Sequence, residues 1–246
     1  VYVWDMDETL ILLKSLLNGT YAQGFNGLKD VQKGIEIGKM WEKHILQICD
    51  DLFFYEQVEN YNKPFLDAMS QYDDGLDLSN YDFNQDGFDD VNKKKLAYRH
   101  RAIANKYKQG LHNILDQEMI NLWEELYNLT DEYTDRWLSS ARAFLEQEPI
   151  NVLVTSGSLI PSLVKCLLFR LDNSIVYSSW EVGKPQCFQW IKERFPNVHF
   201  CVIGDGWEEC EGAQAMQWPF VKIGMHPHRF PGLTLRTLGY YFAVVY

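Results

Sequence analysis

Two aspartates follow an apolar run at the start of the chain, and they are the first residues whose types and spacing could do chemistry. Residues 1–4 read VYVW and residues 5–9 read DMDET, which places Asp5 and Asp7 just beyond the run. Consecutive apolar residues are typical of a strand buried on both faces of a parallel sheet. Ligands of such sheets bind outside the carboxyl ends of the strands. Carboxylates this close repel each other unless a cation lies between them. Mg²⁺ suits that position because it binds few carboxylates, together with waters and a phosphate oxygen.

The DMDET segment resembles motif I of the haloacid dehalogenase (HAD) superfamily. The resemblance implies that Asp5 is a nucleophile that forms an aspartyl-phosphate, and that Asp7 is the general acid and base. Elementary chemistry agrees, because a carboxylate nucleophile divides phosphoryl transfer into two easier steps and a second carboxylic acid can protonate the leaving oxygen. The alternative is that DMDET is only a turn or capping sequence, since Asp and Thr favour such places.

A second candidate segment, Thr155-Ser156-Gly157, follows the apolar run at 150–154. A hydroxyl at a strand tip, together with free backbone N–H groups, could hold a phosphate oxygen, as motif II of the superfamily does. We expect Thr155 to be the main contact, with Ser156, Gly157 and Thr9 also at the phosphate. The alternative role for the segment is to cap the helix that follows it.

Lys184 is the third candidate, because it comes after the apolar run at 175–177 and directly before a proline. This is the position of the motif III lysine in the HAD superfamily. There an ammonium group would neutralise charge among carboxylates and phosphate. Most single lysines are solvated surface residues, so the interpretation depends on this placement.

The run at 198–203 is followed by GDGWEE, which fits the GDxxx[D/E] pattern of motif IV. The resemblance makes Asp205 a direct Mg²⁺ ligand, beside Asp5 and the carbonyl of Asp7. Glu209 is expected as a water-mediated or outer partner of the metal. Glu208 could exchange roles with Glu209, and the spacing leaves both open.

These motifs need elements that end at one edge of a sheet. Strands are expected at 1–4, 150–154, 175–177, 198–203 and 220–223, and helices at 160–171 and 185–195. The alternation predicts an α/β fold with a HAD-like, Rossmannoid, doubly wound parallel sheet. Between motifs I and II, residues 27–148 have mostly helical periodicity and are interpreted as an inserted helical cap domain with an acidic loop at 72–90. The catalytic core would then comprise residues 1–26 and 149–246, with a short hairpin-like segment at 18–21.

Longer segments resemble one branch of the superfamily, the Eyes absent family. They are VYVWDMDETLILLKSLLNGTYA, DGLDLSNYDFNQDGF, NVLVTSGSLIPSLVK, GKPQCF and VIGDGWEE, spread over essentially the whole chain. The resemblance implies a Mg²⁺-dependent phosphatase that acts on protein phosphotyrosine, and it adds a transcription-factor partner and a place in the nucleus or cytoplasm. Departures from the animal pattern, such as SGS at 156–158, suggest a divergent, plant-like member, so the Six-type homeodomain partner of animal members is not carried over.

The amino-acid composition argues against some classes of protein. The sequence has 34 acidic and 23 basic side chains, a net charge of −11, which argues against direct nucleic-acid binding because that requires Lys and Arg to neutralise phosphates. No apolar run reaches the roughly 18 residues of a membrane-spanning helix. Five scattered cysteines without CxxC spacing indicate reduced, partly buried thiols of an intracellular protein. The basic residues Lys93–Lys95, Arg99 and Arg101 would suit a nuclear signal, although such clusters are more often a solvated helix face.

Two other functions stay open. A HAD phosphatase of small molecules would use the same motifs, and a transcriptional coactivator or scaffold would retain them with secondary or vestigial catalysis. The intact set of carboxylates favours an enzyme.

Overall fold

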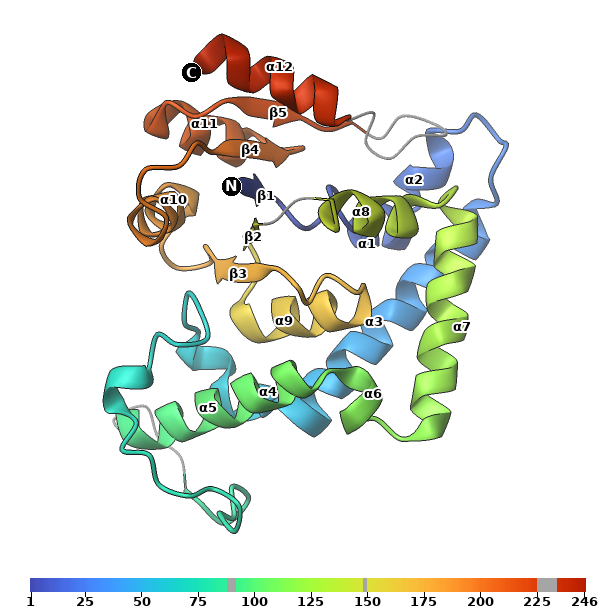
Figure 1. Ribbon diagram of the computed structural model, residues 1–246. Coiled ribbons are helices and arrows are strands. Elements are labelled where there is room, and N and C mark those ends of the chain that lie inside the picture. Colours follow the sequence, from blue (N-terminus) through green and yellow to red (C-terminus); the bar gives the residue numbers. More distant parts are fainter. Residues whose placement is uncertain (88–91, 148–149, 225–233) are drawn as a thin grey trace.

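The computed structural model describes residues 1–87, 92–147, 150–224 and 234–246. Five parallel strands form one sheet in the order β3-β2-β1-β4-β5 (Figure 1). They are β1 (Tyr2–Trp4), β2 (Asn151–Thr155), β3 (Ile175–Ser178), β4 (Cys201–Gly204) and β5 (Phe220–Lys222). The predicted α/β fold with a parallel sheet is thereby confirmed, and each expected strand lies within a few residues of its predicted place.

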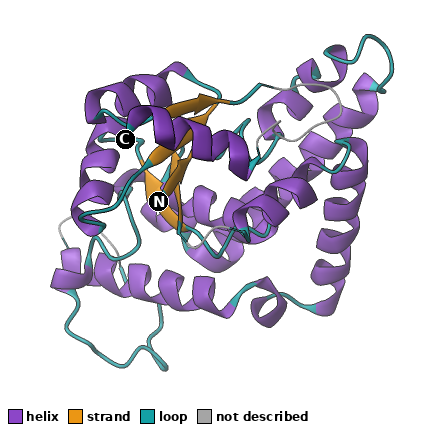
Figure 2. Cartoon of the chain, turned by 45° about the horizontal axis from the view of Figure 1, so that its top comes forward, coloured by secondary structure: helices purple, strands orange, loops and turns teal. Residues whose placement is uncertain are grey.

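Helices cover both faces of the sheet, which explains the consecutive apolar residues in its strands (Figure 2). Val3 packs into a cluster with α10 (Lys184–Arg194) and α11 (Trp207–Met216). The next residue, Trp4, packs into another cluster with α9 (Leu159–Leu168) and α12 (Leu235–Val245). Neighbouring residues of one strand therefore face opposite helical layers, as expected in a doubly wound sheet.

The segment between motifs I and II is helical, as its periodicity predicted. Its long helices are α3 (Val31–Phe53), α5 (Lys93–Gln109), α7 (Gln117–Tyr133) and α8 (Trp137–Leu145). Short helices join them: α1 (Leu13–Leu17), α2 (Thr20–Gln23), α4 (Tyr55–Val58), η1 (Glu59–Tyr61), η2 (Ser70–Tyr72) and α6 (Leu111–Ile114). Asn18 and Gly19 connect α1 to α2, and Thr20 and Tyr21 belong to α2. The expectation of a hairpin-like segment at 18–21 was therefore wrong.

The buried apolar residues of this helical segment are continuous with one face of the sheet. Trp41 of α3 and Leu163 of α9 belong to the same cluster as Trp4 of β1. The indole N–H of Trp123 on α7 donates to the carbonyl oxygen of Leu168, at the end of α9, over 2.7 Å. The division into a core and a cap domain stays a prediction, and its boundary at residues 148–149 lies outside the described residues.

The acidic loop before α5 folds around its own carboxylates. Asp73, Asp77 and Asp82 each accept a hydrogen bond from the backbone N–H two residues later. Arg99 of α5 is fully buried and pairs with Asp86 at 3.0 Å, so the interpretation of this arginine as part of a solvated helix face was wrong. The ion pair ties the loop to α5.

Four of the five cysteines are buried and all five are free thiols. Among the described residues, no helix combines the length and apolar character that crossing a bilayer requires.

Candidate active site

The ends of three neighbouring strands bring motifs I, II and IV together. Asp5 follows β1, Thr155 ends β2 and Asp205 follows β4. The hydroxyl of Thr9 lies 3.4 Å from Asp5 Oδ2 and 3.5 Å from Asp205 Oδ1. A hydroxyl has one proton, so Thr9 donates to one carboxylate at a time and holds the two close to a common point.

The DMDET loop turns sharply back after β1. The backbone N–H groups of Leu10 and Ile11 both donate to the carbonyl oxygen of Met6, whose side chain is fully buried. Glu8 has a φ of 59°, a left-handed conformation that is uncommon for a residue with a side chain. Its Oε1 accepts from the backbone N–H of Ser15 at 3.1 Å, which anchors the turn to α1. The turn places Asp5 and Asp7 just beyond the carboxyl end of β1.

Lys184 lies at the centre of the carboxylate cluster. Gly183, with a φ of 78°, and Pro185 begin α10 and direct the Lys184 side chain inward, where it is 2% exposed. Its Nζ lies 2.6 Å from Asp5 Oδ1 and also pairs with Glu209 Oε1. Burial raises the pKa of Asp5 to about 6, and the ammonium of Lys184 opposes this rise.

Asp7 faces a different pair of groups. The Thr155 hydroxyl donates to Asp7 Oδ2 over 3.3 Å, and Lys165 Nζ lies 2.7 Å from Asp7 Oδ1. Lys165 was missed by the motif reasoning. Its signal in the sequence is a single charge within the otherwise apolar helix that reads LIPSLVKCLL. The side chain reaches from α9 to the carboxyl end of β1.

The predicted phosphate loop differs from expectation in one respect. The backbone N–H of Gly157 donates to the hydroxyl of Thr155, two residues earlier, at 3.1 Å, so the expectation that this N–H is free was wrong. Ser156 donates to Glu208 Oε2 over 3.1 Å, at an exposed position. Glu209 is buried beside Lys184, so the two glutamates occupy different places.

The chemistry of these residues suits Mg²⁺. Among the described residues, no group of three His, Cys, Asp or Glu side chains is already close enough to hold a metal ion. Mg²⁺ needs less, because it is usually held by one or two carboxylates together with waters and phosphate oxygens. Asp5 and Asp205 supply two carboxylates around the Thr9 hydroxyl. Glu209 Oε2 is buried and makes no hydrogen bond with the described residues, so it could accept one from a metal-bound water. The residues therefore fit the ion, with Glu209 as an outer partner.

Similar proteins identify the family of this chain. No model of a protein family matches it. It is 65% identical to the protein phosphatase EYA of Arabidopsis thaliana, over the whole of this chain and 90% of that protein. It is 34% identical to human EYA2 and 32% identical to Drosophila melanogaster eya, over 92% of this chain in both cases. The chain belongs to the Eyes absent (EYA) family of protein phosphatases.

This EYA chain spans about half or less of the length of those two animal relatives, 47% of human EYA2 and 34% of the Drosophila protein. The structure brings together Asp5, Thr9, Asp205, Lys184 and Glu209 as one group. Asp7 and Thr155 form an adjoining group, which Lys165 joins. The metal role of Asp7 through its carbonyl stays a prediction.

Proposed function

We propose that this EYA protein hydrolyses phosphotyrosyl proteins with Asp5 as nucleophile and Mg²⁺ as cofactor. The main support is the pairing of buried Asp5 with Lys184 at 2.6 Å, opposite Asp205 across the Thr9 hydroxyl. This arrangement offers one carboxylate oxygen toward cation and phosphate while the ammonium neutralises the other.

In the first step, an oxygen of Asp5 attacks phosphorus and the bond from phosphorus to the tyrosyl oxygen breaks, which forms an aspartyl-phosphate. With a pKa of about 6, Asp5 is mostly ionised at neutral pH, as a nucleophile must be. Asp7, in its protonated form, gives its proton to the departing tyrosyl oxygen.

In the second step, Asp7 removes a proton from water, and that water attacks phosphorus and releases Asp5 with inorganic phosphate. Thr155 and Lys165 contact the two oxygens of the Asp7 carboxyl group, and would keep it oriented through both steps. Asp5, Asp205 and the Asp7 carbonyl would hold Mg²⁺, which neutralises charge on the phosphoryl oxygens when bound.

Two tryptophans support the preference for an aromatic substrate. Trp180 follows β3 and is 66% exposed, and Trp207 begins α11 after β4 and is 74% exposed. Both lie just beyond the carboxyl ends of strands, on the side where Asp5 is held. Exposed indole rings at these places provide flat apolar surfaces for a phenyl ring. The aromatic residues of the helical segment are less suited, since Tyr55 and Tyr61 pack against the main core.

The test is hydrolysis of phosphotyrosyl peptides, phosphoseryl peptides and metabolite phosphates, with Mg²⁺ and with a chelator. We expect Mg²⁺-dependent release of phosphate from phosphotyrosyl peptides, and Asp5→Asn should lower kcat by at least about 10³-fold because the nucleophile is lost. Asp51→Asn, at an exposed position of α3, is the matched control and should keep full activity.

Three results would contradict the proposal. Full activity of Asp5→Asn would exclude the mechanism, and activity on metabolite phosphates alone would favour the small-molecule phosphatase. A transcription-factor partner whose biological effect survives Asp5→Asn would favour the scaffold function.

A further inference from the structure

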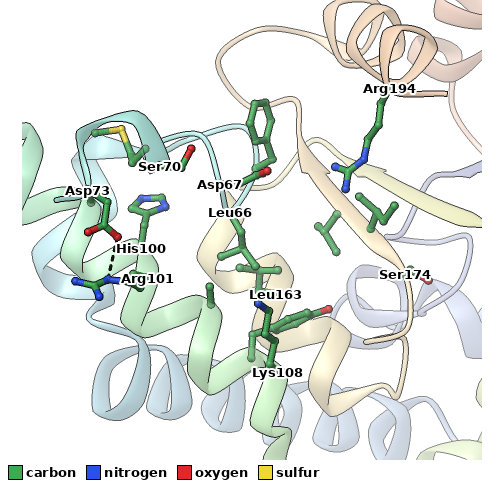
Figure 3. A pocket seen from close by; sticks show the side chains of 17 residues that line it. Leu66, Asp67, Ser70, Asp73, His100, Arg101, Lys108, Leu163, Ser174 and Arg194 are labelled. Carbon is green, nitrogen blue, oxygen red and sulfur yellow. Dashed lines mark ion pairs between the residues drawn. The ribbon is translucent and has the colours of Figure 1, made fainter. Parts of the chain in front are cut away.

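A cavity of about 540 Å³ lies away from the candidate active site, between α5, α9, β3 and the segment before η2 (Figure 3). Its β3 residues, Ile175 and Val176, are at the amino end of that strand, whereas Asp5 and Thr155 are at carboxyl ends. The volume falls within the range of about 300–1,000 Å³ that small-molecule sites occupy. The catalytic residues do not line it.

The interior of the cavity is mostly apolar. Side chains from four elements form it: Leu66, Met69, Ala97, Ala104, Leu163 and Val176. Two side chains with buried polar atoms, His100 and Tyr107, lie among them. His100 is 4% exposed, and its buried Nδ1 makes no hydrogen bond with the described residues. Burial lowers the pKa of His100 to about 4, so its ring is neutral at pH 7 and offers a hydrogen bond without a charge.

The rim of the cavity carries three cations, Arg101, Lys108 and Arg194, and two carboxylates, Asp67 and Asp73, although the protein as a whole is strongly acidic. Arg101 is neutralised by Asp73 at 2.9 Å (Figure 3). Lys108 on α5 and Arg194 on α10 are exposed, and neither pairs with a carboxylate among the described residues. Arg194 only donates to the Tyr177 hydroxyl, over 3.4 Å. Lys108 and Arg194 thus remain available to a ligand, and with Asp67 counted the rim keeps an excess of one positive charge.

We propose that this cavity binds a small organic anion, with an aromatic or branched apolar body inside and one acidic group at the rim between Lys108 and Arg194. The body would replace water against the apolar interior, and a hydroxyl of the ligand would donate to His100 Nδ1. Charge complementarity selects an anion over a neutral molecule of the same shape. This site is separate from the phosphatase reaction.

The probe is anilinonaphthalene sulfonate, an apolar aromatic anion, with neutral phenylnaphthylamine as its uncharged counterpart. Titration followed by fluorescence and calorimetry should show one saturable site per chain for the sulfonate. Bound probe should also raise the midpoint of thermal unfolding, because a ligand of the native state stabilises that state. The same titration on Asp5→Asn should give the same affinity, which keeps this test independent of catalysis.

Two kinds of variant locate the site. Ala104→Trp fills the cavity and should weaken sulfonate binding by at least about tenfold. The double variant Lys108→Glu with Arg194→Glu should weaken the sulfonate by about tenfold and leave the neutral compound nearly unchanged. Lys39→Glu with Lys192→Glu makes the same change in net charge at exposed positions outside the cavity, and should leave both affinities unchanged.

Equal binding of the charged and neutral compounds, or no loss with the double variant, would overturn the anion proposal. Unchanged binding to a folded Ala104→Trp would place the probe elsewhere and overturn the site. If that variant does not unfold cooperatively, the double variant decides alone, because its changes are at exposed positions.

Discussion

The position of the Lys165 ammonium group depends on the apolar residues around the stem of its side chain. It is the single charge of α9, and its neighbours Val164, Cys166 and Leu167 are buried. The stem of a lysine can cross apolar surface while the ammonium group reaches a polar site. Here the ammonium lies 2.7 Å from Asp7 Oδ1, with the Thr155 hydroxyl on the other carboxylate oxygen. Asp7 therefore has a fixed orientation before any substrate binds.

Removal of this cation should slow proton transfer. Lys165→Met should lower kcat on phosphotyrosyl peptide by about tenfold with little change in KM, because Asp7 loses its orientation whereas the phosphate contacts remain. The loss should be smaller with nitrophenyl phosphate, since nitrophenolate leaves without a proton. Steady-state kinetics with both substrates measures this difference.

Lys165→Arg should restore part of the activity, and Lys39→Met on the exposed side of α3 should change nothing. An equal loss on both substrates would mean that Lys165 does not assist proton transfer to the leaving oxygen, and that it acts on the second step, on the phosphoryl group or on folding.

At the scale of elements, the junction between β4 and α11 is unusually close to motif I. A Cβ atom at Gly204 would lie 2.7 Å from Glu209 Cγ and 3.1 Å from Asp5 Cβ. Only a glycine leaves room for both side chains to approach Lys184. The glycine of motif IV is therefore required by packing at the strand end.

Gly204→Ala should separate these groups. We expect a loss of about 1–3 kcal/mol in the free energy of unfolding, because an extra methyl group overpacks a filled region. Activity should fall more than the stability loss explains, since the added methyl group displaces Asp5 or Glu209. Denaturant unfolding and kcat/KM measured on the same samples test both effects.

Gly239→Ala is the matched control, because a Cβ atom at that position of α12 meets nothing within 4 Å. Normal activity of Gly204→Ala would show that the carboxylates tolerate displacement at this junction.

At the scale of the whole molecule, the helical segment and the α/β layer share buried surface. Ile37 of α3 and Leu153 of β2 belong to one apolar cluster, although motif II lies far along the chain from α3. Loss of packing in either part exposes surface of the other. Cooperative unfolding follows from this continuity.

Ile37→Ala should therefore destabilise the entire molecule. The side chain is 1% exposed, and its truncation should cost about 2–5 kcal/mol while the protein still unfolds in one transition. Calorimetry should give equal calorimetric and van't Hoff enthalpies for the wild type and the variant. Two separate transitions, of which only one shifts, would show that the helical segment folds independently.

The features that could be predicted from the sequence are those that depend on residues close together in the chain. Strands buried on both faces carry consecutive apolar residues, so β1 and β2 and the carboxylates beyond them could be located from the sequence. The contact of Lys165 with Asp7 across 158 positions depends on how distant segments pack, so no local pattern could predict it. Buried Arg99 belongs to the same class, because its partner Asp86 lies in the loop before α5.

The buried thiols affect how this protein would respond to oxidants. Burial raises the pKa values of Cys49, Cys187 and Cys201 to about 12, so thiolate is scarce at neutral pH. Peroxide reacts with thiolate and hardly with carboxylate. A hydrolase that uses Asp5 as its nucleophile would keep that nucleophile under oxidative stress that inactivates phosphatases with a cysteine nucleophile. It could continue to remove phosphate while those enzymes are inactive.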